Sequence, residues 1–245
     1  MDDVAYRLLY ETELNHWWDK VRRMIVLKLI KKYSNSSKLT ILDLGCGTGV
    51  MAKEAESLGE YHGIDVSEQA INFCKTRGVK NVKQGDALHI PHNDNQFDVV
   101  LLLDAIEHVE DDLGVMAEAS RVLRPGGIVI ITAPAYKFLW GPSDEVFHHY
   151  RRYRLGELRR KLEQKNFSVV KHSYFNTLLF LPIAVIKLVV KFFCSSISEN
   201  DISRQIVNNN WILNKILYYI FYLESLFLPY VSFPFGVSVL AVGRK

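Results

Sequence analysis

Short apolar runs alternate with longer amphipathic stretches along most of the chain. Runs that end at a glycine or an acidic residue predict buried strands over 40–44, 61–65, 79–84, 97–103 and 128–132. Apolar positions at helical spacing predict one or two helices over 4–33, and further helices over 50–58, 67–75, 111–123 and 155–165. Two more strands are expected over 167–174 and 237–242. Strands that alternate with helices predict a parallel sheet with helices on both faces, which is an α/β fold.

The stretch between the last two predicted strands breaks this alternation. Its ends, 177–193 and 211–235, are apolar, and 195–210 between them is polar. Neither apolar end suits a membrane span, because one is short and carries Lys187, and the other carries Glu224 and two prolines. Two interpretations stay open. The stretch is a helical subdomain that packs on the sheet or forms a homodimer, or it is a lipophilic surface for a hydrophobic acceptor and for weak contact with a membrane.

The same patterns divide the chain into four parts. They are an N-terminal helical cover (1–38), an α/β core (39–175), an apolar helical insertion (176–235) and the final strand of the core (236–245). A length of 245 residues suits one α/β domain with an insertion better than two independent domains.

Charge and cysteine content narrow the class of protein. A net charge of +3 is too small to indicate a nucleic-acid partner. The three cysteines, Cys46, Cys74 and Cys194, have neither disulfide nor zinc spacing, which is typical of a reducing compartment. The acidic start of the sequence does not resemble a signal peptide. We therefore expect a cytoplasmic chain, peripheral to the inner face of the membrane if the insertion touches lipid.

A glycine-rich loop follows the first predicted strand and opens a helix. Gly45, Gly47 and Gly49 allow the backbone to turn sharply and to approach a ligand closely. A dinucleotide fingerprint requires its third glycine at position 50, which is Val50. Asp43 at the head of the loop would also repel a pyrophosphate, whereas it suits a ligand that carries ammonium and sulfonium charges.

Acidic residues also end the second and third predicted strands. Asp65 lies twenty-two residues after Asp43 and can accept hydrogen bonds from both hydroxyls of a ribose. Asp86 can accept from an adenine amine while the Ala87 N–H meets the ring. The carboxyl ends of successive strands line the crevice where open α/β sheets bind ligands, so these acids predict a nucleoside site.

The segments ILDLGCGTG, GID, GDA, FDVVLLLDAIEHVED and LRPGG follow one another over 41–134. In this order they resemble the class I S-adenosylmethionine-dependent methyltransferases, in particular the methyltransferase type 11 or UbiE-like group. The resemblance implies a doubly wound seven-stranded sheet in the order 3-2-1-4-5-7-6, with strand 7 antiparallel. It implies S-adenosylmethionine as cofactor, S-adenosylhomocysteine as product, and a contact of Asp104 with the methionine end.

The segment HWWDKVRR over 16–23 resembles the entry helix of many uncharacterised members of this superfamily, and 140–153 matches the same group. We expect both segments to close over the cofactor. The expected cofactor-binding residues are Asp43, Gly45, Cys46, Gly47, Gly49, Asp65, Val66, Asp86, Ala87, Asp104, Trp17 and Arg23.

Methyl transfer is an in-line displacement, so the protein mainly has to align the nucleophile with the methyl group. A general base helps when the nucleophile is a hydroxyl or a protonated amine. The candidate bases are His148, His149 and His108, with Glu107, Asp144 and Glu145 near them in sequence. No metal site is expected, because adjacent histidines such as His148 and His149 cannot comfortably ligate one ion.

The sequence thus predicts a methyltransferase that acts on a small or lipid-like acceptor. The alternative is a regulatory protein that binds S-adenosylmethionine or a nucleoside without catalysis. A pyridine-nucleotide oxidoreductase is disfavoured by Val50 and Asp43. The identity of the acceptor and the atom that is methylated stay open.

Overall fold

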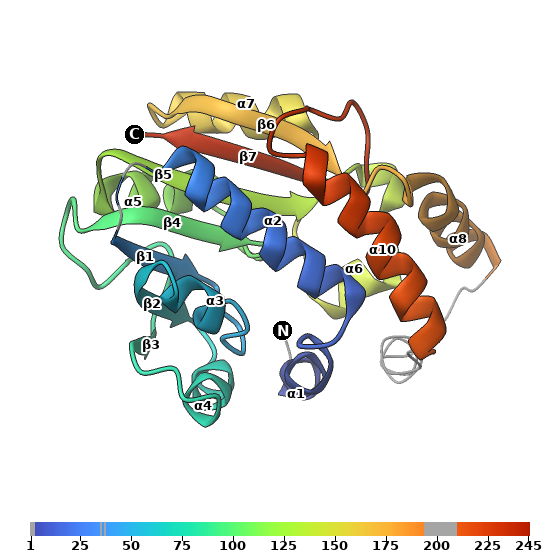
Figure 1. Cartoon of the computed structure of the whole chain (residues 1–245), viewed down its shortest axis with the longest axis horizontal. Coiled ribbons are helices and arrows are strands. Elements are labelled where there is room, and N and C mark those ends of the chain that lie inside the picture. Colours follow the sequence, from blue (N-terminus) through green and yellow to red (C-terminus); the bar gives the residue numbers. More distant parts are fainter. Residues whose placement is uncertain (1–2, 35, 37, 194–209) are drawn as a thin grey trace.

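The computed structural model of the chain describes residues 3–34, 36, 38–193 and 210–245. Its centre is a seven-stranded sheet in the order β3-β2-β1-β4-β5-β7-β6 (Figure 1). The strands are β1 (Leu39–Leu44), β2 (Gly59–Asp65), β3 (Val82–Gln84), β4 (Phe97–Leu103), β5 (Leu123–Pro134), β6 (Ser168–Phe175) and β7 (Ser238–Arg244). Most of the predicted polar segment over 195–210 lies outside the described residues.

The predicted α/β class and strand order are confirmed. β1 to β5 pair in parallel, and β7 runs antiparallel between β5 and β6. β4 occupies the middle of the sheet, and its apolar run is buried on both sides, as a central parallel strand requires. The antiparallel β7 returns the chain from the edge at which the other strands end.

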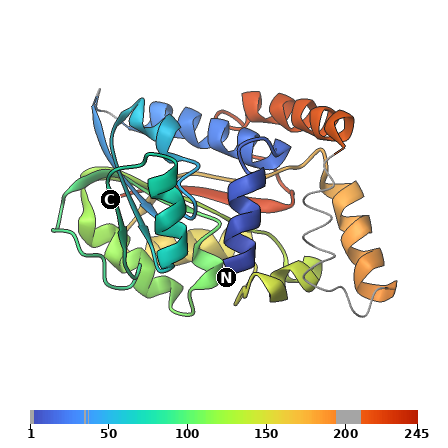
Figure 2. The same ribbon diagram turned by 90° about the horizontal axis from the view of Figure 1, so that it is seen from below.

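Helices cover both faces of the sheet. They are α1 (Asp3–Thr12), α2 (Trp17–Tyr33), α3 (Ala52–Glu56), α4 (Glu68–Thr76), α5 (Asp112–Val122), α6 (Pro142–Val146), α7 (Leu155–Gln164), α8 (Phe180–Phe193) and α10 (Trp211–Phe227). Two short 3-10 turns are η1 (Ile106–His108) and η2 (Lys137–Leu139). α2, α3 and α10 lie on one face, and α5 and α7 lie on the other (Figure 2).

Local sequence explains where several of these elements begin and end. Ser67 is the N-cap of α4, because its side chain accepts a hydrogen bond from the Ala70 amide. β3 is shorter than the predicted 79–84, because only its last three residues pair with β2. β5 begins before the predicted strand at 128, and residues 124–127 within it are an irregularity, where Leu123 pairs with Phe97 and Ile128 pairs with Val99.

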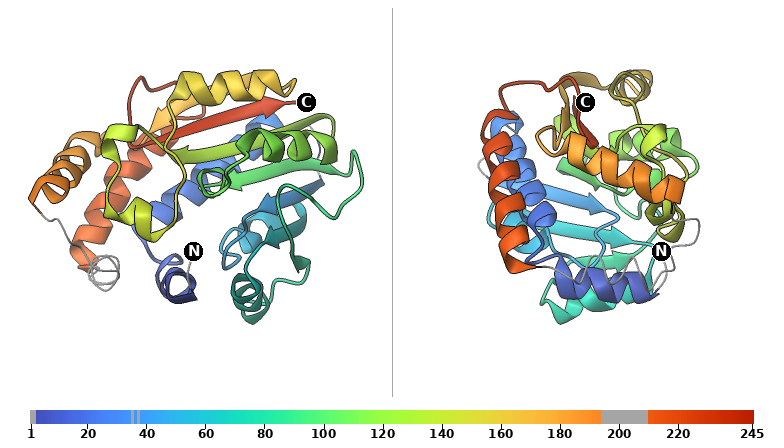
Figure 3. Two further views of the ribbon diagram at one scale, coloured as in Figure 1. Left: turned by 180° about the vertical axis from the view of Figure 1, so that it is seen from behind. Right: turned by 90° about the vertical axis from the view of Figure 1, so that its right-hand side faces the viewer.

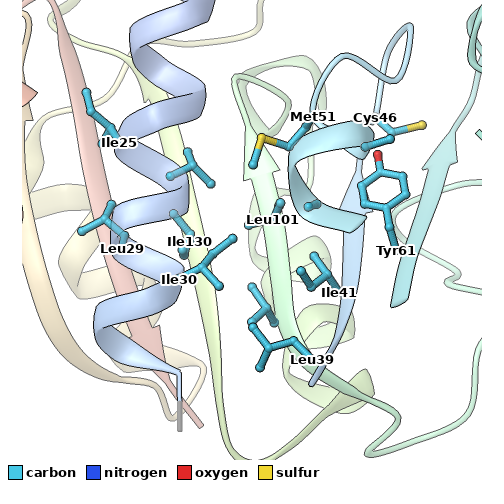
Figure 4. Packing of buried hydrophobic residues seen from close by; sticks show 14 of the residues in the cluster. Ile25, Leu29, Ile30, Leu39, Ile41, Cys46, Met51, Tyr61, Leu101 and Ile130 are labelled. Atoms are coloured by element: carbon cyan, nitrogen blue, oxygen red, sulfur yellow. The ribbon is translucent and has the colours of Figure 1, made fainter. Parts of the chain in front are cut away.

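The larger of the two faces is closed by the N-terminal helix α2. Ile25, Leu29 and Ile30 of this helix are fully buried against the sheet (Figure 4). Ile41 and Leu101 lie on the sheet side of the same cluster. The predicted N-terminal cover is therefore part of the core and not a loose lid.

The insertion is fastened to α2 through its second helix. The aromatic rings of Trp18 and Phe221 stack at 5.2 Å, and those of Trp18 and Phe175 stack at 5.4 Å. Lys28 donates hydrogen bonds to the backbone and hydroxyl oxygens of Ser225, which lies on α10. α10 therefore packs one apolar side on α2 and on Phe175 at the end of β6.

The outer side of the insertion remains apolar and exposed. Figure 3 shows α8 and α10 at the end of the molecule toward which β4, β5 and β6 run. Large apolar side chains at least half exposed on these helices are Leu181, Val185, Ile186, Trp211, Ile212, Leu213, Ile216, Tyr219, Leu223 and Phe227. Among the helices over the described residues, none combines the length and apolarity that crossing a bilayer requires.

The aromatic stack predicts where the stability of the insertion resides. Phe221 is fully buried, so Phe221→Ala should lower the free energy of unfolding by about 3–5 kcal/mol. Tyr219 is on the same helix but 54% exposed, so Tyr219→Ala should change it by no more than about 0.5 kcal/mol. Urea unfolding followed by circular dichroism measures both values. Equal losses in the two variants would mean that α10 is not anchored through this stack.

Candidate functional site

The glycine loop after β1 has the backbone geometry that only glycine adopts easily. Gly45, Gly47 and Gly49 have φ angles of +73°, +55° and +78°. A Cβ atom on Gly45 would lie 2.7 Å from the Cβ of Ala105, at the end of β4. The loop therefore packs closely against the end of the neighbouring strand.

The position over Gly47 is open. No heavy atom of the described residues lies within 4 Å of the point where a Cβ of Gly47 would be. Cys46 turns away from this opening, toward Cys74 at 3.9 Å between the two sulfur atoms, and burial with that contact raises the pKa of its thiol. The loop thus offers backbone and space to a ligand, while Cys46 is part of the packing beneath it.

Asp65, at the end of β2, binds the glycine loop directly. Its carboxylate accepts hydrogen bonds from the Gly47 amide at 2.9 Å and from the Ser67 amide at 3.0 Å. The hydroxyl of Tyr6, on α1, donates to the same carboxylate at 3.1 Å. The described structure therefore holds a hydroxyl group where a ribose hydroxyl is expected to bind.

The adenine end of the expected site faces solvent. The Asp86 carboxylate is 54% exposed and accepts a hydrogen bond from the Leu88 amide at 2.9 Å. Val66, after Asp65, is 71% exposed, which is high for a large apolar side chain. An apolar side chain and an acid beside it suit the face and the amine of an adenine ring, and Ala87 lies next to them in the chain.

Asp43 lies beneath the loop and not on its open side. It is 3% exposed and accepts a hydrogen bond from the Tyr61 hydroxyl at 2.9 Å. Burial raises the pKa of its carboxyl to about 6, against the opposing effects of the Tyr61 bond and of Arg22. Asp43 therefore acts on a bound cation through its field and its position, and not through an exposed carboxylate.

Arg22 of α2 reaches the end of β4. Its guanidinium pairs with Asp104, whose φ angle of +52° is unusual for a residue other than glycine. The neighbouring Arg23 binds Glu54 at 2.9 Å and the backbone oxygen of Glu13 at 3.0 Å, so it fastens α2 to its neighbours, and its expected role at the cofactor stays a prediction. Helical spacing does not distinguish the two arginines, because the buried Val26 lies four residues from one and three from the other.

Trp17 lies at the contact between α2 and α10. Its ring meets Phe221 edge-on at 5.8 Å, and its amide donates to Asn214 of α10 at 2.8 Å. Trp17 therefore stabilises the contact between the N-terminal cover and the insertion. Its expected role at the cofactor stays a prediction.

The segments after β4 and β5 bring a second group of side chains together. Ligand atoms of Glu107, His108 and His149 lie within 4.8 Å of one another. The rings of His108 and His149 are 4.7 Å apart, and Asp144 accepts a hydrogen bond from Nδ1 of His149 at 2.9 Å. The expectation of no metal site considered the adjacent pair His148 and His149, whereas the fold brings His149 beside Glu107 and His108, and the expectation itself stays a prediction.

The same arrangement distinguishes the three candidate bases. His149 is oriented by the buried Asp144, as a general base requires. Burial, with His149 beside it, lowers the pKa of His108 to about 3, so its imidazole is neutral. His148 has a φ angle of +54° in the turn after α6. His108 and His149 lie together at the carboxyl edge of the sheet.

Sequence comparisons agree with this geometry. Residues 42–131 match the family model described as a methyltransferase domain. The chain is 35% identical over 127 residues to a demethylmenaquinone methyltransferase of Staphylococcus aureus, which covers 46% of this chain and 53% of that protein. The chain spans about half the length of the curated relatives it matches.

Solved structures share the fold. A SAM dependent methyltransferase from Archaeoglobus fulgidus has a TM-score of 0.56 at 19% identity, covering 93% of this chain and 97% of its own. The cyclase SpnF has a TM-score of 0.58 at 18% identity, covering 90% of this chain and 79% of its own. Proteins of this fold therefore include a cyclase as well as methyltransferases, so the fold alone does not define the chemistry.

Removing the Asp65 carboxylate should weaken cofactor binding. Asp65→Ala loses the acceptor for the ribose, so affinity for S-adenosylmethionine should fall by about 2–4 kcal/mol in calorimetric titration. Asp94→Ala is the control, since that side chain is 67% exposed and pairs with Arg121. Unchanged affinity in a folded Asp65→Ala protein would reject the assignment, and preferential binding of NAD by the wild type would reject the class.

The buried Asp43 predicts a pH dependence of stability. Its folded pKa of about 6 lies above the unfolded value of about 3.9, so its contribution to stability is lost as pH rises from about 4 through 6. Asp43→Asn keeps an acceptor for Tyr61 without the charge. The variant should therefore gain up to about 3 kcal/mol relative to wild type across this window, measured by urea unfolding. Parallel pH profiles of the two proteins would show that Asp43 does not titrate there.

Proposed function

Because residues 42–131 are a methyltransferase domain of the class I, S-adenosylmethionine-dependent kind, we propose that the whole chain transfers a methyl group from this cofactor to a lipid-like acceptor. The observation that carries the proposal is the carboxyl edge of the sheet. There the open side of Gly47 follows β1, the carboxylate of Asp65 ends β2, and Asp104, paired with Arg22 of α2, follows β4. The bound cofactor supplies a methyl group that its sulfonium already activates.

The residues of this edge bind and orient the cofactor. Asp65 accepts from the ribose hydroxyls once the Tyr6 hydroxyl gives up its place. Val66, Asp86 and Ala87 receive the adenine ring. Arg22 is held by Asp104 at the other end, where its guanidinium suits the carboxylate of a methionine moiety.

The acceptor approaches from the side of the insertion. α8 follows β6, α10 precedes β7, and both lie where the central strands end (Figure 3). Lys187 of α8 lies 3.5 Å from the hydroxyl of Ser143 on α6. Ser143 is next in the chain to Asp144, the hydrogen-bond partner of His149. The apolar outer sides of α8 and α10 support an acceptor with a hydrocarbon part, presented at a membrane surface.

The curated relative from S. aureus supports the same class of acceptor. Its name gives demethylmenaquinone as substrate, an aromatic quinone that carries a hydrocarbon tail. We propose a related aromatic molecule with a tail for this chain. A regulatory protein without catalysis is not favoured, because the pair of Asp144 and His149 provides an oriented proton acceptor beside the cofactor edge.

A direct assay tests the proposal. The protein is incubated with S-adenosylmethionine that carries a labelled methyl group and with a reduced naphthoquinone that has an isoprenoid tail. We expect a labelled acceptor and S-adenosylhomocysteine as products. The same ring without a tail should have a kcat/KM at least roughly tenfold lower, since two buried methylene groups at about 0.8 kcal/mol each account for that factor. Binding of the cofactor without transfer to any tailed aromatic acceptor would favour the regulatory alternative.

The insertion offers a matched pair of variants for this assay. Leu223 on α10 is 55% exposed, and Leu223→Glu should reduce kcat/KM for the tailed acceptor but not for the bare ring. Val170 on β6 is 38% exposed outside the insertion, and Val170→Glu should leave both unchanged. Equal effects of the two variants would show that the insertion does not contribute to the acceptor site.

A further inference from the structure

Glu107, His108 and His149 form a set of possible metal ligands, of which the methyl transfer proposed above uses only His149, as a proton acceptor in the absence of a metal. The first two lie on η1 after β4, and the third lies after α6, forty-one residues later along the chain. Their ligand atoms lie within 4.8 Å of one another. Zinc bonds of about 2.1 Å bring tetrahedral ligands to roughly 3.4 Å from one another, so small side-chain rotations are enough to close the set around one ion.

The two histidines already have the outer partners that metal ligands use. Nδ1 of His149 is bonded to Asp144, which leaves Nε2 of the ring for a metal. Asp144 is itself buried and held by Arg152 at 2.7 Å. His108 forms a hydrogen bond with the backbone of Phe147. A carboxylate or a backbone carbonyl on the second nitrogen is the usual support of a metal-bound histidine.

One oxygen of the carboxyl group in the set lacks a partner. Glu107 is 1% exposed, and its Oε2 has no hydrogen-bond partner among the described residues. The arginines nearby form their ion pairs elsewhere, since Arg22 pairs with Asp104 and Arg152 pairs with Asp144. A buried polar oxygen without a partner is costly, and a cation coordinated by it removes that cost.

We infer that Glu107, His108 and His149 bind one divalent transition-metal ion, whose open position takes a hydroxyl oxygen of the acceptor. Two imidazoles and one carboxylate are the ligand set of catalytic zinc and of mononuclear non-haem iron, which keep a position for a further ligand. The role in the reaction rests on the proposed function, whereas the binding of the metal does not.

A metal here ionises the acceptor. The hydroxyl group loses its proton to solvent water, and its oxygen keeps the electron pair and stays on the metal. The ionised acceptor then supplies an electron pair to form the bond to the methyl carbon. The bond from that carbon to sulfur breaks, and its electrons stay on sulfur, which becomes a neutral thioether. The acceptor class is therefore a phenol or a hydroquinone.

Titration of the chelator-treated full chain with Zn²⁺ and Co²⁺ tests the site without any methyl acceptor. We expect one equivalent to bind, with the visible absorption bands of low-coordinate Co²⁺. Glu107→Gln and His108→Asn should each weaken binding at least about 100-fold, and Asp144→Asn should weaken it about 10–100-fold. His172→Ala, on β6, is the matched histidine control and should leave affinity unchanged. Circular dichroism establishes which variants fold, and any one folded ligand variant is sufficient.

The possible outcomes test metal binding separately from its role in methyl transfer. Failure to bind one equivalent, or binding that folded Glu107→Gln and His108→Asn proteins retain, overturns the metal site and leaves the proposed methyl transfer standing. If the metal binds at the cluster, its removal should lower kcat on a hydroquinone on the order of 100-fold, and its return should restore it. Unchanged kcat in the metal-free protein overturns the role in ionisation. Metal binding without methylation of any acceptor supports the site and rejects the proposed function.

Discussion

The carboxylate of Asp65 connects three parts of the chain that are far apart in sequence. It ends β2, accepts the Gly47 amide of the loop after β1, and receives the Tyr6 hydroxyl from α1. A buried carboxylate is stable only while such donors surround it. The tight course of the glycine loop and the position of α1 therefore depend on one group, which is also the proposed acceptor for the ribose hydroxyls.

The second constraint is aromatic packing. Trp18 stacks between Phe175 at the end of β6 and Phe221 on α10, so one side chain joins the N-terminal cover, the sheet and the insertion. This packing lets α10 bury one side and leave the other apolar and exposed at the end of the sheet. The packing thus holds in place an exposed apolar surface, which by itself lowers the solubility of a protein. This surface lies where a hydrophobic molecule would reach the proposed cofactor site.

Much of the core was predictable because its signals are local. The apolar run of β4, the glycines after β1 and the cap at Ser67 each act within a few residues, and they located the sheet and the cofactor loop.

Features that depend on contacts between distant residues were not predictable. Neither the choice of Arg22 over Arg23 nor the meeting of His108 with His149 can be inferred from spacing alone, since each depends on how a helix or loop is rotated by its packing. The irregular pairing at 124–127 was missed for the same reason, because a proline-glycine turn and a bulged strand share one local sequence.

Asn214 of α10 joins the insertion to the N-terminal helices α1 and α2. It accepts the Trp17 amide and donates to the backbone oxygen of Asn15 at 3.0 Å, so it clamps the joint between α1 and α2. α1 carries Tyr6, whose hydroxyl occupies the Asp65 carboxylate at which the proposed ribose would bind. The helix over the proposed ribose site is therefore fastened, at its C-terminal end, by a residue of the insertion. A shift of α10 on binding an acceptor would thus reach Tyr6 and the cofactor end of the site through this one side chain.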